Sequence, residues 1–443
     1  MKIERVEYAG GRVVVYRGDV RAVLASLGEG SVQCCVTSPP YWGLRSYLKP
    51  DDPLKPLEMG CEPTPDLYVQ HLVEVFRGVR RVLRDDGLLF LNLGDSYWGG
   101  KGQNGTSKAL GNAAERGWVQ SGGTPVMAMR PQDGRHDVLK PKDLCMMPAR
   151  VAMALQADGW WLRSMIPWLK RNPMPESTTD RPSSAVEYVF LLAKSARPFY
   201  DGEGVRVRGA GVTGGACFGK QGQDAEGTKA QQRKYDRPDY GTRARRNSDW
   251  WMESWQGLYT DDDGEPLALI VNPAAYKEAH FATFPPGLVQ PCIKAGTSEK
   301  GCCPTCGAPW GRVVERQGST SKAIGKSAAK RAQGLATAFS GYEDGSSAPT
   351  FRTLGWRPTC GCPVAEPVPC TCLDVFCGSG TTLGVAAQLG RHAIGIELNS
   401  TYLPMIRERV EGAIEARRIE KGGTPLTGDP AKDAVIEGRR TFF

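Results

Sequence analysis

The feature that most constrains the fold is a short strand that runs into a glycine-rich turn and then into a helix. Residues 373–382 read Leu-Asp-Val-Phe-Cys-Gly-Ser-Gly-Thr-Thr, and an apolar helical segment follows at 383–389. Such a turn brings backbone N–H groups and a helix N-terminus up to a ligand. Alone it can be merely a tight turn, but Glu397 ends the next strand, where an acidic residue can bind ribose hydroxyls. The pair predicts a nucleoside ligand. The spacing is not Gly-x-Gly-x-x-Gly and no Gly-Lys-Ser/Thr follows, which disfavours a dinucleotide or a triphosphate.

Strand-like and helix-like segments alternate through much of the chain. Residues 66–84 carry apolar side chains at helical spacing, and 88–93 is an apolar run typical of a buried strand. Between them, Asp85-Asp86-Gly87 is expected as the turn that ends the helix. The same alternation is expected at 3–36, 148–170, 185–193 and 373–418. This order predicts an α/β fold with a mainly parallel, doubly wound sheet.

The composition is that of a globular protein, because 40% of the 443 residues are apolar and 23% are charged. This length predicts one large domain with insertions, or two to three domains. No run approaches the roughly 20 apolar residues that a membrane span requires, and the polar start of the sequence lacks a signal segment. We therefore expect a cytoplasmic protein without membrane contact. The net charge of +8 permits nucleic acid as a partner without demonstrating it.

A second motif, Ser38-Pro39-Pro40-Tyr41, follows the apolar run at 32–37. The exocyclic amino group of a base is a poor nucleophile, because its lone pair is delocalised into the ring. Acceptors aimed at its hydrogens can pull the nitrogen toward tetrahedral geometry. Ser38 and the backbone carbonyl of Pro39 can supply two such acceptors, which the prolines hold in place. Tyr41 can stack on a base rotated out of the duplex. A turn that merely closes the strand is the alternative.

Together the two motifs resemble the signatures of the amino-group DNA methyltransferases, and their order along the chain resembles the β group of that family. The resemblance implies a permuted Rossmann-like core and transfer of a methyl group from S-adenosyl-L-methionine (SAM) to a base amino group, without a covalent enzyme intermediate. In this family, Ser in the first motif position is associated mainly with cytosine N4 and Asp mainly with adenine N6. Cytosine N4 is therefore the expected target, and adenine N6 stays open.

The resemblance also assigns residues to SAM. The methionine end would lie against Asp374 and the turn after it, the ribose against Glu397 and the adenine near Asp19. The segment around 281–284 would lie against the adenosine. The full expected cofactor set is Asp19, Phe281, Phe284, Asp374, Phe376, Cys377, Gly378, Ser379, Gly380, Thr381 and Glu397.

Further segments resemble the parts of the family that contact DNA. Residues 172–191 resemble the target-base pocket, although Val186 stands where relatives usually carry His, which puts a His-mediated contact there in doubt. Residues 201–270, rich in Gly, Arg, Lys and aromatic residues, lie where the β group carries its target-recognition region. A solvated loop without DNA contacts is the alternative. The expected partner is double-stranded DNA, and the protein is expected to be nucleoid-associated in a bacterial or phage-infected cell. A cognate restriction nuclease and the oligomeric state stay open. Weaker candidates for DNA contact are Lys322, Lys326 and Lys330.

Seven of the 14 cysteines lie at 302–372. An unexported chain keeps its thiols reduced, so such a cluster suggests a metal before disulfides. Cys303-x-x-Cys306 with Cys360-x-Cys362 has the pattern of a four-thiolate zinc site and resembles a zinc-ribbon-like insertion of some relatives. Free thiols are the alternative. Three further cysteines could displace one of these ligands: Cys302, Cys370 and Cys372.

The expected domain organisation follows from these assignments. It comprises a catalytic half of the core at 1–200, a target-recognition insertion at 201–270, an adenosine segment at 271–300, a Cys-rich insertion at 301–372 with a mobile loop at 316–350, a SAM-binding half at 373–420 and a flexible tail at 421–443.

Two other functions stay open: a catalytically idle nucleic-acid-binding protein, and methylation of RNA or protein. Cytosine C5 methylation is disfavoured, because its Pro-Cys nucleophile would follow the cofactor motif. Here Pro291-Cys292 and Pro369-Cys370 both precede Asp374.

Overall fold

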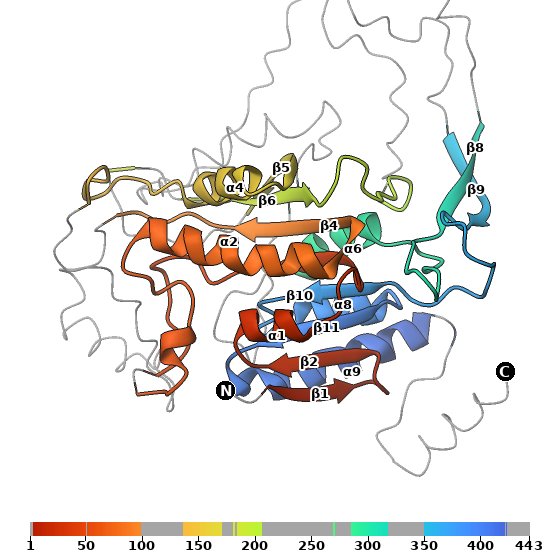
Figure 1. Ribbon diagram of the computed structural model, residues 1–443, viewed down its shortest axis with the longest axis horizontal. Coiled ribbons are helices and arrows are strands. Elements are labelled where there is room, and N and C mark those ends of the chain that lie inside the picture. Colours follow the sequence, from red (N-terminus) through yellow and green to blue (C-terminus); the bar gives the residue numbers. More distant parts are fainter. Residues whose placement is uncertain are drawn as a thin grey trace, which may run out of the picture.

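A nine-stranded sheet forms the centre of the protein in the computed structural model, which describes residues 3–49, 51–98, 136–170, 180–181, 184–205, 269–270, 285–317, 350–420 and 422. The strand order is β1-β2-β11-β10-β3-β4-β6-β5-β7 (Figure 1). The strands of this sheet are β1 (Glu4–Tyr8), β2 (Val13–Arg17), β3 (Val32–Thr37), β4 (Leu83–Leu93), β5 (Trp161–Leu169), β6 (Val186–Ala193), β7 (Leu269–Ile270), β10 (Thr371–Asp374) and β11 (His392–Glu397).

The middle of the sheet is parallel and its edges are mixed. Strands β2, β11, β10, β3 and β4 pair in parallel, as do β5 and β7. Strand β1 runs antiparallel to β2, and β6 runs antiparallel to both β4 and β5. Strands β10 and β11 lie between β2 and β3, so segments from both ends of the chain complete one sheet. The mainly parallel α/β sheet expected from the sequence is confirmed.

Helices cover both faces of the sheet, because each face buries its own hydrophobic cluster. Helices α1, α2 and α4 contribute to one cluster, and α6, α8 and α9 contribute to the other (Figure 1). The doubly wound arrangement expected from the alternation of elements is therefore present. The helices are α1 (Val20–Ser26), η1 (Lys55–Leu57), α2 (Pro65–Val82), α4 (Met147–Ala157), α6 (Pro286–Gly296), α8 (Thr381–Gln388), η2 (Ser400–Tyr402) and α9 (Leu403–Glu420).

The predicted turn at 85–87 is wrong. Strand β4 begins at Leu83, directly after α2, and Asp85, Asp86 and Gly87 form a bulge inside the strand. Val32 pairs with Leu83 and Cys34 already pairs with Leu88, so β4 carries extra residues between the two pairs. Leu83 is fully buried, which draws the chain into the sheet before the polar residues occur. A Cβ on Gly87 would lie 3.0 Å from the Arg84 carbonyl oxygen, so the bulge leaves little room for a side chain there.

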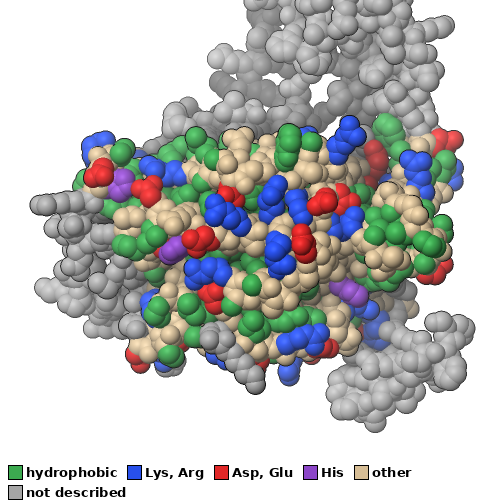
Figure 2. Space-filling view, viewed as in Figure 1, with side chains coloured by type: hydrophobic (Ala, Val, Ile, Leu, Met, Phe, Trp, Pro, Cys, Tyr) green, Lys and Arg blue, Asp and Glu red, His purple; other side chains and the backbone are tan. Residues whose placement is uncertain are grey.

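A separate hairpin lies outside the main sheet. Strands β8 (Gly311–Gln317) and β9 (Thr350–Arg357) pair antiparallel, and they lie at the right of Figure 1. The face drawn in Figure 2 carries basic and acidic side chains intermixed, without one continuous basic field. Arg77 pairs with Asp158 and Arg84 with Asp86. None of the described helices combines the length and the hydropathy that crossing a bilayer demands.

Candidate active site

The two sequence motifs meet at one edge of the sheet. Strands β3 and β10 are parallel neighbours, so Ser38, after β3, and the glycine turn, after β10, leave the sheet on the same side. Both motifs line one cavity with a volume of about 490 Å³. The predicted site residues that line it are Asp19, Ser38, Pro39, Pro40, Tyr41, Phe376, Cys377, Gly378, Ser379, Thr381 and Glu397. Asp374 precedes Val375, which also lines the cavity, and Gly380 lies between Ser379 and Thr381. Phe281 and Phe284 lie outside the described residues.

Asp374 is fully buried at the end of β10. Its Oδ1 accepts hydrogen bonds from Thr37 Oγ1 at 2.7 Å and from the Phe376 amide at 3.1 Å. Its other oxygen, Oδ2, is buried and has no hydrogen-bond partner among the described residues. Burial raises the pKa of Asp374 to about 6. A cationic donor next to Oδ2 would satisfy this oxygen and stabilise the ionised carboxylate.

The glycine turn is closely packed and leaves polar groups unpaired. Gly380 has φ +82°, and a side chain there would lie 3.1 Å from Ile406 Cγ1, so the position requires glycine. The Ser379 hydroxyl is buried and has no hydrogen-bond partner within the described part of the chain. Such an orphaned group beside a helix N-terminus suits a bound anionic or polar ligand.

Glu397 ties the next strand to the turn. Its Oε2 accepts from the Gly378 amide at 2.8 Å, and its Oε1 accepts from the Asn399 amide at 2.8 Å. Burial raises the pKa of Glu397 to about 7. Each carboxylate oxygen keeps a further lone pair, so Glu397 can still accept from ligand hydroxyls. This contact brings Glu397 and the glycine turn together.

Asp19 caps helix α1 and also lines the cavity. As the N-cap of α1, it accepts from the amides of Arg21 and Ala22 at 3.0 and 3.1 Å. It also pairs with the Arg21 guanidinium at 3.1 Å. These contacts hold its carboxylate in place, and Asp19 lines the cavity.

The Ser38-Pro39-Pro40-Tyr41 motif is held by contacts from other elements. Tyr68 of α2 donates a 2.8 Å hydrogen bond to the Pro40 carbonyl. The Tyr41 ring packs against Gly94, where a Cβ would lie 2.5 Å from Tyr41 Cε2. Burial raises the pKa of Tyr41 well above its usual range, so its hydroxyl stays protonated. It donates at 2.6 Å to Oε2 of Glu187 on β6.

Sequence reasoning missed three polar residues beside this motif. Asn92 of β4 donates from Nδ2 toward Tyr41 Oη at 2.8 Å and Ser38 Oγ at 3.3 Å. Glu187 also forms an ion pair with Lys170. The signal was present, because Asn92 interrupts the apolar run 88–93 and Glu187 interrupts the apolar run 185–193. Val186, noted for the absence of His, also lines the cavity.

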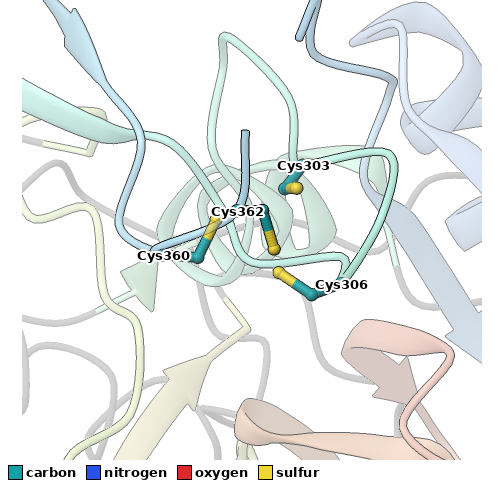
Figure 3. A group of neighbouring side chains, drawn as sticks. All are labelled: Cys303, Cys306, Cys360 and Cys362. Carbon is teal, nitrogen blue, oxygen red and sulfur yellow. The ribbon is translucent and has the colours of Figure 1, made fainter. Parts of the chain in front are cut away.

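The four cysteines expected to bind metal lie together. The Sγ atoms of Cys303, Cys306, Cys360 and Cys362 all lie within 4.8 Å of one another (Figure 3). A tetrahedral zinc with Zn–S bonds of about 2.3 Å needs sulfurs about 3.8 Å apart, which this group can meet with small shifts. Hydrogen bonds from the backbone amides of Cys306 and Thr305 lower the pKa of Cys303 to about 6, which favours the thiolate that a metal requires.

The spare cysteines are not part of this group. Cys370 and Cys372 are fully buried, Cys372 as part of β10. Cys302 is buried at the start of the loop at 302–307, which we call the knuckle. The knuckle contacts the core at two points. Gln33 Nε2 donates to the Gly307 carbonyl at 3.0 Å, and Arg84 donates to the Cys306 carbonyl.

Several expected regions lie in large part outside the described residues. Outside the described residues lie 206–268 of the insertion expected at 201–270, and 172–179, 182 and 183 of the segment expected at 172–191. The same holds for 318–349 of the loop expected at 316–350, with Lys322, Lys326 and Lys330, and for 421 and 423–443 of the expected tail.

Comparison with known proteins gives one consistent family. The DNA methylase family model (N6/N4 methyltransferases) matches residues 32–303 and 370–408, more than half of the chain. The Type II methyltransferase M.SmaI of Serratia marcescens is 30% identical over 393 residues, which cover 89% of this chain and 89% of the relative. The Type II methyltransferase M.XycI of Xanthomonas campestris pv. cyanopsidis is 37% identical over 283 residues, covering 64% of this chain and 72% of the relative. The solved PvuII DNA methyltransferase (cytosine-N4-specific) aligns over 95% of each chain, with a TM-score of 0.45 and 13% identity.

Proposed function

Since this chain belongs to the DNA methylase family of N6 and N4 amino-methyltransferases, we propose that it methylates cytosine N4 in double-stranded DNA, with SAM as the methyl donor. One observation carries the proposal: Ser38 and the glycine turn after Asp374 line the same cavity from adjacent parallel strands. A base amino group at Ser38 and a nucleoside cofactor at the turn would therefore lie within reach of each other.

The residues at the turn fit the chemical groups of SAM. The unpaired Asp374 Oδ2 suits a cationic amino group, and the unpaired Ser379 hydroxyl suits a carboxylate. Glu397 would accept from the ribose hydroxyls, and Asp19 would lie near the adenine. Bound there, SAM supplies an electrophilic methyl group. Phe281 and Phe284 remain proposed contacts to its adenosine.

At the other end of the cavity, Ser38 and the Pro39 carbonyl would accept the hydrogens of the target amino group. This contact would localise the nitrogen lone pair for in-line attack, and no residue would become covalently attached to the base. Tyr41, with its ring packed against Gly94, would stack on the base after its rotation out of the duplex.

The choice of cytosine N4 rests on serine in the first motif position. Adenine N6 is the alternative, because adenine also presents an amino group beside a ring nitrogen. Residues 201–270 would recognise the target sequence, between a catalytic half at 1–200 and a SAM-binding half at 373–420. The Type II naming of the relatives supports a cognate restriction nuclease as a functional partner.

We also propose one structural zinc ion on Cys303, Cys306, Cys360 and Cys362. Support comes from the four gathered thiols and from the two pairs being supplied by segments that flank the hairpin β8–β9. Zinc would fix the base of this hairpin against the core.

Expression in a methylation-free host, with nucleoside mass spectrometry and modified-base sequencing of the host DNA, tests the function. We expect N4-methylcytosine at one short sequence, and none with Ser38→Ala. If N6-methyladenine were the modified base found, the target would be adenine N6 and not cytosine N4. Unmodified DNA, together with DNA binding by the purified protein, would favour the idle nucleic-acid-binding protein. Methyl transfer to RNA or protein but not to DNA would show that the substrate is not DNA.

A further inference from the structure

A chain of polar contacts leads from the catalytic serine to a carboxylate on another strand. The Ser38 hydroxyl interacts with the Tyr41 hydroxyl and opposes the rise in the pKa of Tyr41, and both hydroxyls lie within 3.3 Å of Asn92 Nδ2. Tyr41 donates to Glu187 Oε2 at 2.6 Å, and the other Glu187 oxygen pairs with Lys170. Asn92 Nδ2 lies within hydrogen-bond distance of all three, at 3.3 Å from Ser38 Oγ, 2.8 Å from Tyr41 Oη and 3.2 Å from Glu187 Oε2.

The carboxylate at the end of this chain determines the direction of every hydrogen bond in it. An ionised carboxylate can only accept, so the Tyr41 hydrogen must point to Glu187. Tyr41 Oη is then left with lone pairs alone, and the Ser38 hydrogen can point to it. The same carboxylate favours the Asn92 orientation in which Nδ2, not Oδ1, faces the group, because two facing acceptors would repel.

This direction matters because a serine hydroxyl can either donate or accept. The hydrogens of a base amino group need an acceptor. If the Ser38 hydrogen pointed into the cavity, it would meet those hydrogens and oppose binding. With its hydrogen directed at Tyr41, Ser38 keeps a lone pair for the cavity. An acidic residue in the same position accepts in any orientation, so the requirement is specific to serine.

We propose that Glu187 is a positioning residue that orients the Ser38 hydroxyl through Tyr41, so that Ser38 faces the target amino group as an acceptor. The inference rests on the proposed amino-group methyl transfer. Lys170 offsets the charge of Glu187 where both side chains are largely enclosed, with exposures of 19% and 14%. Lys170 and Glu187 also line the cavity, so the chain ends at the proposed base site.

The test is Glu187→Gln, which keeps the size of the side chain but adds an N–H donor. This donor can reverse the direction of the hydrogen bonds between Ser38, Tyr41 and residue 187. With SAM and a DNA fragment bearing the mapped site, we expect kcat to fall at least about 10-fold, with KM for DNA and Kd for SAM within about twofold of wild type. Tyr41→Phe removes the link between Ser38 and Glu187, so Tyr41→Phe and the double variant should show similar losses. Exposed Glu7→Gln is the matched control for a Glu-to-Gln change.

Three outcomes would overturn the inference. These are a wild-type kcat in Glu187→Gln, a loss confined to KM or to SAM binding, and additive losses in the double variant, which would mean that Glu187 and Tyr41 act separately. If Glu187→Gln unfolds, as judged by thermal melting, a wild-type kcat in Tyr41→Phe would still overturn it. Absence of methyl transfer by the wild-type protein would instead overturn the proposed function, so the two failures are distinguishable.

Discussion

Tyr41 and Glu187, 146 positions apart in the chain, are joined by a 2.6 Å hydrogen bond. The contact links the loop after β3 to the start of β6, two strands that are separated in the sheet by β4. It places a carboxylate next to Tyr41, and Asn92 of the intervening strand contacts both residues. The Ser38-Pro39-Pro40-Tyr41 motif is therefore one side of a larger polar site.

Removing the Ser38 hydroxyl should slow methyl transfer without loosening the fold. Ser38→Ala removes one positioned acceptor, and we expect a loss of about 10²-fold or more in kcat, by analogy with the loss of one oxyanion-hole donor. Binding of SAM, measured by calorimetry, should change little. Ser31→Ala, at an exposed serine directly after the turn at 29–30, serves as the control. Full activity in Ser38→Ala would show that the motif's first residue has no role in transfer.

Adding one methyl group at Gly94 should displace Tyr41. A Cβ there would lie 2.5 Å from Tyr41 Cε2, closer than carbon atoms tolerate. We expect Gly94→Ala to lower kcat about as much as Tyr41→Phe, because the ring and its hydroxyl both move. Gly28→Ala is the control, since its Cβ would meet nothing closer than 3.7 Å. If Gly94→Ala were as active as the control Gly28→Ala, methyl transfer would not require the observed position of Tyr41.

Binding of SAM should release protons near pH 6. The pKa of Asp374 is raised to about 6 and that of Glu397 to about 7, so both carboxyls are partly protonated there. A cationic amino group and ribose hydroxyls favour the ionised forms, so affinity should rise as pH increases through 6 to 7. Calorimetry at pH 6 in buffers of different ionisation enthalpy should report release on the order of one proton, and less at pH 8.

The same two carboxyl groups also determine how the stability of the cofactor-free protein changes with pH. Carboxyl pKa values raised by folding contribute stability at low pH that is lost as pH rises through the folded values, so the free energy of unfolding should decrease between about pH 4 and 7. Asp374→Asn should reduce both the proton release and the affinity for SAM. Binding heats independent of the buffer would contradict the assignment of these carboxyls to the cofactor site.

Protein purified without chelator should contain about one zinc per chain, as a four-thiolate site requires. Cys360→Ser/Cys362→Ser should lose the metal, and chelation of wild-type protein should lower its melting temperature. Cys61→Ser, at a half-buried cysteine outside the cluster, should keep it. Absence of zinc in the wild-type protein would contradict the proposed zinc site. Full zinc in the double variant would point to other ligands, although Cys370 and Cys372 are buried away from the cluster.

Of the two ion pairs that Arg312 makes at the base of the hairpin, the one with Asp201 should contribute more to stability. Arg312 of β8 contacts buried Asp201 at 2.8 Å and exposed Glu299 at 2.9 Å. Arg312→Met leaves a buried carboxylate unpaired and should lower the free energy of unfolding by about 3 kcal/mol. Glu299→Gln should cost no more than about 1 kcal/mol, because that carboxylate is solvated. Urea unfolding of both variants measures the difference, and equal losses would contradict this ranking.

The sequence by itself determined the local parts of this protein. The strand, glycine turn and helix at 371–388, the acidic end of β11 and the tetrapeptide after β3 were all predictable, because turn chemistry and apolar periodicity are written in neighbouring residues. The alternation of elements also predicted the parallel centre of the sheet. Parallel neighbours end at one edge, so the meeting of Ser38 with the glycine turn followed from the fold class.

Only the tertiary structure decided which distant residues complete the site. Asn92 and Glu187 meet because β4 and β6 pair antiparallel, with Asn92 opposite Val189 and Leu93 opposite Tyr188. Strand register depends on how a whole face is buried, and a slip of one residue would turn both side chains away. Burial also decided between cysteines of equal chemistry, since β10 draws Cys372 into the core while Cys360 and Cys362 stay outside it. The bulge at 85–87 has the same origin, because burial of Leu83 outweighed the turn preference of the residues that follow it.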